Sequence, residues 1–192
     1  PNLSWTHNDT FSDNGTYNVS ASINRNNQLT DTRTLSDFRD AVTGAPLLAQ
    51  EGFNSASSIR DAVFATSRIQ WRLGAGEQFS LQPFIVHHET KTKTAANLTQ
   101  SLGVDPMPYV TSANTANSKD NVARLNAQLL KRLDAQTRID ARANIGIFQR
   151  KSDALLNQFA ADNALSLNQT TKSDIDDKSW SLNLKALRSF AS

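Results

Sequence analysis

The strictest constraint on the fold is an alternating run from Arg138 to Arg150, which reads RIDARANIGIFQR. From position 139 to position 147 every second residue is aliphatic, and most of the residues between them are charged or polar. Successive side chains of a β-strand point to opposite faces, so the run predicts a strand with one apolar face and one polar face. The aliphatic set is Ile139, Ala141, Ala143, Ile145 and Ile147, and the polar set includes Arg138, Asp140, Arg142 and Asn144.

The same period of two recurs along the chain. It predicts strands within residues 15–25, 60–73, 79–86, 121–133 and 180–190, with weaker candidates at 2–6 and 28–36. Short links with turn-forming residues are predicted to close hairpins, at Arg25–Gln28, Gly74–Glu77 and Leu133–Gln136. Long polar segments are predicted to be loops, at Asp37–Ser58, Thr92–Asp120 and Ser152–Asp177. The sequence therefore predicts one all-β domain over residues 1–192, an antiparallel transmembrane β-barrel portion of about eight strands.

Composition excludes several function classes. The 20 Lys and Arg residues nearly balance 18 Asp and Glu residues, so the chain is not built to bind nucleic acid. With 0 Cys there is no thiolate site and no disulfide, and no catalytic motif is recognisable, so we expect no enzyme and no cofactor. His87 and His88 are neighbours that point to opposite faces of a strand, so we expect no metal site. A mean hydropathy of −0.49 still permits a barrel, because barrel strands turn only half of their residues toward lipid.

Long strands with short turns at one end and long loops at the other are typical of outer-membrane barrels. On this hypothesis the apolar set faces lipid, and the polar set faces a watery lumen. Predicted lipid-facing residues are Ile139, Ala141, Ala143, Ile145, Ile147, Leu182 and Leu184. Candidate ligand-binding residues of the lumen are His88, Arg124, Arg138, Arg142 and Arg150, with cross-strand ion pairs such as those of Asp140 as the alternative role. Predicted aromatic girdles contain Trp71, Phe79 and Phe190 at the turn ends, and Tyr17 and Trp180 at the loop ends.

One hairpin also resembles a known family. Arg68–Phe84, RIQWRLGAGEQFSLQPF, resembles barrel hairpins of TonB-dependent outer-membrane receptors, and the Asn121–Arg150 hairpin is similar. The resemblance implies a parent barrel of about 22 strands with a plug domain and a TonB box, for energised uptake of a scarce nutrient such as a ferric siderophore. Neither plug nor TonB box is recognisable here, so we expect a mid-barrel fragment in the bacterial outer membrane. The implied partners are outer-membrane lipid, the plug of the same parent protein, TonB through a missing N-terminal region, and a siderophore-like ligand.

Two alternatives stay open at this stage. The first is a complete small barrel of about eight strands that serves as a membrane anchor or adhesin. The second is a soluble β-barrel or β-sandwich binding protein, in which the apolar set would face inward and the loops would be short at both ends.

Overall fold

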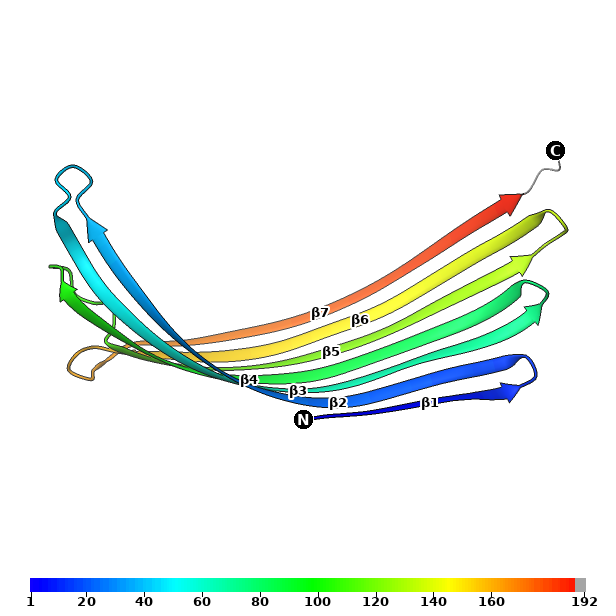
Figure 1. The fold of residues 1–192 in the computed structure, drawn as a ribbon, viewed down its shortest axis with the longest axis horizontal. Coiled ribbons are helices and arrows are strands. Elements are labelled where there is room, and N and C mark those ends of the chain that lie inside the picture. Colours follow the sequence, from blue (N-terminus) through cyan, green and yellow to red (C-terminus); the bar gives the residue numbers. More distant parts are fainter. Residues whose placement is uncertain (189–192) are drawn as a thin grey trace.

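The computed structural model describes residues 1–188 and arranges them in one antiparallel sheet of 7 strands that follow each other in chain order (Figure 1). The strands are β1 (Asn2–Ser12), β2 (Gly15–Arg39), β3 (Pro46–Gly74), β4 (Glu77–Leu102), β5 (Thr111–Arg132), β6 (Thr137–Phe159) and β7 (Leu165–Arg188). The all-β fold is thus confirmed. The strand number is 7 rather than about eight, and the described sheet is not closed, because β1 and β7 do not contact each other.

Two of the three predicted hairpins are confirmed, those at Gly74–Glu77 and Leu133–Gln136. In the first, Gly76 adopts a φ of 77°, a left-handed conformation that favours glycine. In the second, the Asp134 carboxylate accepts the backbone N–H of Gln136 at 2.8 Å and that of Thr137 at 2.7 Å. These hydrogen bonds, the one from Gln136 contributing most, lower the pKa of Asp134, and they hold the turn.

The predicted turn at Arg25–Gln28 is wrong, since these residues lie in the middle of β2. Their pairing with β3 continues without interruption, and Arg25 Nε donates to Asp61 Oδ1 at 2.6 Å across the two strands. Cross-strand pairing therefore overrides the turn preference of Asn26 and Asn27. Two predicted strands merge into one, which accounts for the smaller strand number.

The prediction of three long loops is also wrong. Most of Asp37–Ser58, Thr92–Asp120 and Ser152–Asp177 is strand, so β2 to β7 contain 22 to 29 residues each. The connections at this end are short and span residues 40–45, 103–110 and 160–164. These strand halves are mostly polar, and their apolar residues, such as Leu47, Phe53 and Leu155, do not alternate regularly, so they lack the pattern from which a strand is predicted.

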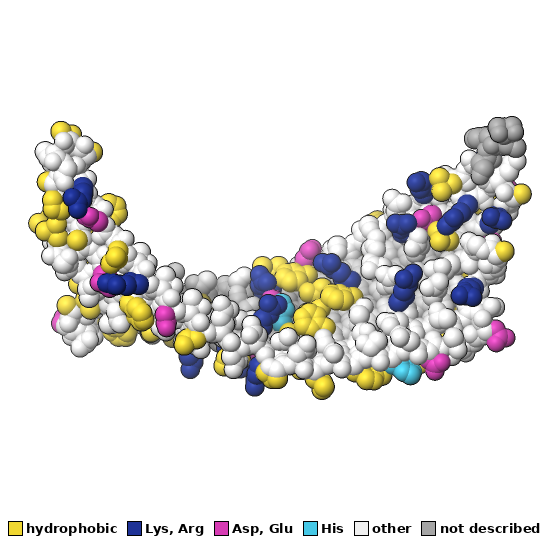
Figure 2. All heavy atoms as spheres, in the orientation of Figure 1, with side chains coloured by type: hydrophobic (Ala, Val, Ile, Leu, Met, Phe, Trp, Pro, Cys, Tyr) yellow, Lys and Arg dark blue, Asp and Glu magenta, His cyan; other side chains and the backbone are white. Residues whose placement is uncertain are grey.

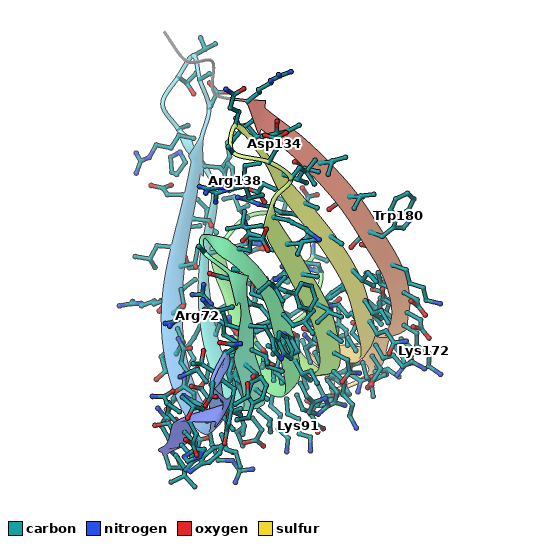
Figure 3. The ribbon with its side chains drawn as sticks, turned by 90° about the vertical axis from the view of Figure 1, so that its right-hand side faces the viewer. Arg72, Lys91, Asp134, Arg138, Lys172 and Trp180 are labelled. Atoms are coloured by element: carbon teal, nitrogen blue, oxygen red, sulfur yellow. The ribbon has the colours of Figure 1, made fainter. Side chains whose placement is uncertain are left out.

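The register confirms that the alternating sets share faces across strands. Ile145 of β6 lies opposite Leu125 of β5 and Trp180 of β7, and Ala141 and Ala143 likewise lie between apolar residues. At the two ends of the set, Ile139 and Ile147 each have one apolar neighbour and one lysine neighbour. Figure 3 shows Trp180 on one side of the sheet and Arg72 and Arg138 on the other. We call these two sides the apolar face and the polar face.

The sheet is a single curved layer (Figure 1). Among residues 1–188 the buried hydrophobic residues are Ala62 and Val86, at 6% and 7% exposed. A sheet normally buries its apolar face against a second layer. The described strands provide no such layer, so the apolar face stays uncovered.

Candidate functional site

A continuous apolar band covers the half of the apolar face that lies toward the short turns. Many of its members are exposed, such as Ile145 at 57%, Leu182 at 71% and Trp180 at 81%, and the others are partly exposed. An exposed apolar patch of this extent marks a surface that is covered by something else. The apolar band comprises the odd-numbered residues of 17–23, 63–71, 79–85, 123–129 and 139–147 and the even-numbered residues of 180–186, with Ser67 as a polar interruption.

Aromatic side chains gather at the turn end of the apolar band. The ring of Trp71 lies 5.5 Å from that of Phe79 and 5.6 Å from that of Phe11, which in turn lies 6.4 Å from Tyr17. The prediction that Tyr17 lies at the loop end is therefore wrong, because the unpredicted turn at residues 13–14 reverses the chain just before β2. Trp180 lies at the opposite border of the band, and Phe190 falls outside the described residues.

Charged residues border the apolar band on its loop side. Six of them lie opposite one another on six successive strands and form what we call the charged row. Ion pairs join three pairs of directly opposed residues on adjacent strands: Arg25 with Asp61 at 2.6 Å, Lys119 with Glu89 at 3.8 Å, and Lys151 with Asp174 at 3.5 Å. The charged row consists of Arg25, Asp61, Glu89, Lys119, Lys151 and Asp174.

The polar face carries a buried carboxylate, Asp120, at about the same level along the strands as the charged row. The side chain of Asp120 is 2% exposed, and the register places it directly opposite His88 of β4 and Arg150 of β6. Arg150 donates to both carboxylate oxygens, at 2.6 Å from Nε and 2.9 Å from Nη2, and His88 Nε2 lies 2.5 Å from Oδ2. Charge-assisted bonds of this kind are strong and fix the orientation of both partners. His88 therefore carries a proton on Nε2, while its buried Nδ1 has no hydrogen-bond partner within the described residues.

Aromatic and aliphatic side chains interrupt the polar face beside Asp120. One row of them crosses β3 to β6, two residues nearer the short turns than the row of Asp120, and consists of Phe64, Val86, Val122 and Phe148. The Arg150 guanidinium carbon lies 5.5 Å from the centre of the Phe148 ring, a cation–π contact. Figure 2 shows hydrophobic side chains gathered beside histidine and basic side chains near the middle of this face. Phe148, which does not fit the alternation in the sequence, thus belongs to a local apolar cluster.

Arg124 of β5 lies two residues nearer the short turns than Val122, opposite Phe84 of β4 and Gly146 of β6. A Cβ on Gly146 would lie 2.9 Å from Ser179 Oγ, which is too close, and 3.7 Å from Arg124 Cγ, which is an ordinary contact, so glycine here leaves room for the serine of β7. The arrangement joins a fixed guanidinium, a second arginine and an apolar surface. Because Arg150 already donates to both oxygens of Asp120, Arg124 is the cation that remains to meet an anionic group beside this apolar surface. We call it the polar-face site, made of Phe64, Phe84, Val86, His88, Asp120, Val122, Arg124, Phe148 and Arg150.

The five predicted ligand-binding residues share the polar face, but only some of them meet. His88 and Arg150 contact the same carboxylate, that of Asp120, and Arg124 lies four residues further along β5. Arg142 instead pairs at 2.8 Å with Asp140 of the same strand, and not across strands as the alternative role predicts. Arg138 lies opposite Arg132 at the turn end. His87 points to the apolar face, where its Nδ1 lies 2.6 Å from Asn121 Oδ1.

Sequence reasoning missed Asp120, because it lay at the end of a segment predicted to be a loop. The signal that could have revealed the site is the set of apolar residues on polar positions, namely Phe64, Phe84, Val86 and Phe148. Each is an apolar residue at a polar position of its own strand, and only the pairing register shows that these residues are neighbours on the polar face.

The sequence matches no protein-family model and no curated protein. Among the described residues, no helix has the length and apolar character needed to cross a bilayer. Residues 1–188 also contain no cluster of three or more His, Asp or Glu side chains that could hold a metal ion.

Proposed function

We propose that this chain forms part of the wall of an outer-membrane receptor of the TonB-dependent kind, which takes up a scarce nutrient such as a ferric siderophore. The observation that carries the proposal is the exposed apolar band on a single-layer sheet. In water such a band would have to be covered, and no described residue covers it. Lipid supplies the cover without a second protein layer.

The dimensions of the apolar band suit a bilayer. On β6 it runs over nine residues, from Ile139 to Ile147. Nine residues extend about 30 Å along a strand, which becomes about 23 Å when the strand is tilted by about 40°. The apolar band of an outer-membrane barrel is about 25 Å tall. The aromatic cluster of Phe11, Tyr17, Trp71 and Phe79 would then lie at the periplasmic border, and the charged row at the outer border.

The remaining strand length supports a receptor rather than a minimal anchor. About 9 to 11 residues suffice for a tilted strand to cross a bilayer, whereas β3 contains 29 residues and β4 contains 26. The loop-side halves would therefore project beyond the membrane and raise a wall around a vestibule for ligand. The polar-face site lies where this wall begins and would face the ligand or the plug of the parent protein.

Uptake in a deletion strain tests this function. Removing the parent gene is expected to abolish energised uptake of one labelled ferric chelate at limiting concentration, and the wild-type gene should restore it. A protonophore should stop the restored uptake, because TonB depends on the energised inner membrane. Passive entry of a small porin substrate serves as the control and should not change. Unchanged uptake of every chelate in the panel, or uptake that survives the protonophore, would count against the receptor.

A further inference from the structure

The charged row contains an arrangement that is unfavourable on its own. Lys119 of β5 and Lys151 of β6 lie directly opposite each other on the apolar face. Directly opposed like charges in a sheet are destabilising, because the Cβ atoms are only about 5 Å apart. Each lysine has one acidic partner, but at longer range than the 2.6 Å of the Arg25–Asp61 pair: Glu89 lies 3.8 Å from Lys119 and Asp174 lies 3.5 Å from Lys151. Lys119 and Lys151 are therefore the more weakly paired cations of the charged row.

Basic residues outnumber acidic ones in this part of the face. Lys91 and Lys93 of β4 lie on the same side of the sheet as Lys119, two and four residues further toward the loops than Glu89, which is the residue opposite Lys119. Lys91 also pairs with Glu89 at 3.3 Å. The side chains of Lys91, Lys119 and Lys151 are 62%, 58% and 76% exposed, so their ammonium groups are accessible. Figure 3 shows Lys91 and Lys172 on the same side of the sheet as Trp180, which belongs to the apolar band.

The lysines lie at the height that a lipid headgroup would occupy. Lys151 follows Ile147, the last apolar residue of β6, by four positions, or about 13 Å of strand. Between them lies a polar row in which His87 and Asn121 bond to each other at 2.6 Å. Acyl chains on the apolar band would thus place ester or amide groups at this polar row and a headgroup phosphate at the lysines.

We infer that Lys119 and Lys151, assisted by Lys91 and Lys93, bind the phosphate of a lipid of the outer leaflet whose acyl chains lie on the apolar band. The inference rests on the proposed position of the band in the membrane. It adds a specific contact, since a lipid phosphate bridges the two opposed lysines and relieves their repulsion. A phosphorylated lipid is preferred over a neutral one because Lys119 and Lys151 meet the phosphate, while Lys91 and Lys93 add positive charge further along the same face.

Lipid binding to the full parent protein tests the inference. The protein is reconstituted in phosphatidylcholine vesicles, and the binding of spin-labelled phosphatidic acid is measured. The double variant Lys119→Gln/Lys151→Gln is compared with Lys131→Gln/Lys185→Gln, which removes the same charge at the turn end of the sheet. Each lysine of the proposed site is expected to contribute about fivefold in affinity, and the control pair should have no measurable effect. Raising the salt to about 0.5 M should shrink the difference.

Membrane assembly, measured on the same samples, separates this inference from the proposed function. If the wild type and both variants insert into vesicles and bind phosphatidic acid equally well, the lipid site is refuted while the barrel stands. If the wild type does not insert at all, the proposed function is refuted and the lipid site with it.

Discussion

Leu182→Arg is expected to lower the stability of the membrane-inserted protein by about 2–4 kcal/mol, because it brings a cation near the middle of the apolar band. Leu182 lies opposite Ala143 and is 71% exposed in the isolated sheet. In a soluble protein the same exposure would make the change harmless. The measurement is the free energy of unfolding of the full parent protein in phospholipid vesicles, from urea titration.

Ser181→Arg is the matched control, on the adjacent residue and the opposite face. It removes one exposed hydrogen bond, from Asn144 Nδ2 at 2.9 Å, and brings the same charge toward the polar face. It should therefore unfold close to the wild type. Equal behaviour of the two variants would show that the two faces of β7 have the same surroundings, which contradicts a lipid-facing band.

Arg150→Met is expected to destabilise the protein by about 1–3 kcal/mol through the Asp120 carboxylate, which would keep only His88 as a partner. The side chain of Asp120 is 2% exposed and cannot recover the lost bonds from water. The double variant Asp120→Leu/Arg150→Met should regain much of the loss, because it removes the buried charge altogether. Both are measured by the same urea titration.

Arg25→Met provides the control for an exposed ion pair. Arg25 and Asp61 form an equally short contact of 2.6 Å, but their side chains are 56% and 48% exposed. Surface pairs of this kind contribute little, so the variant should be close to the wild type. If Arg25→Met lowered the free energy of unfolding as much as Arg150→Met does, the burial of Asp120 would not make its ion pair contribute more to stability than an exposed pair.

The faces of the sheet were predictable because alternation is a local property. In RIDARANIGIFQR the apolar parity alone assigns Ile139 and Ile147 to one face, and the register confirms that assignment with Ala186 and Ala123 as neighbours. The hairpin at Gly74–Glu77 was predictable for the same reason, since glycine satisfies a left-handed turn locally.

The long strands and the polar-face site were not predictable, because they depend on pairing between distant residues. Lys91, Thr92, Lys93 and Thr94 are polar on both faces, so no alternation distinguishes that strand half from a loop. Asp120 lies 30 positions before Arg150 in the sequence, and only the register of β5 and β6 brings the two side chains together.

The central claim is that the apolar face meets lipid and the polar face meets water. The chain contains 0 Cys, so single cysteines can be introduced at successive positions from Arg138 to Arg150 and spin-labelled in the full parent protein in vesicles. Labels at odd-numbered positions from 139 to 147 should collide with oxygen dissolved in lipid, and labels at even-numbered positions with a water-soluble nickel complex. Odd-numbered labels shielded from both reagents, as in a closed protein core, would contradict the account.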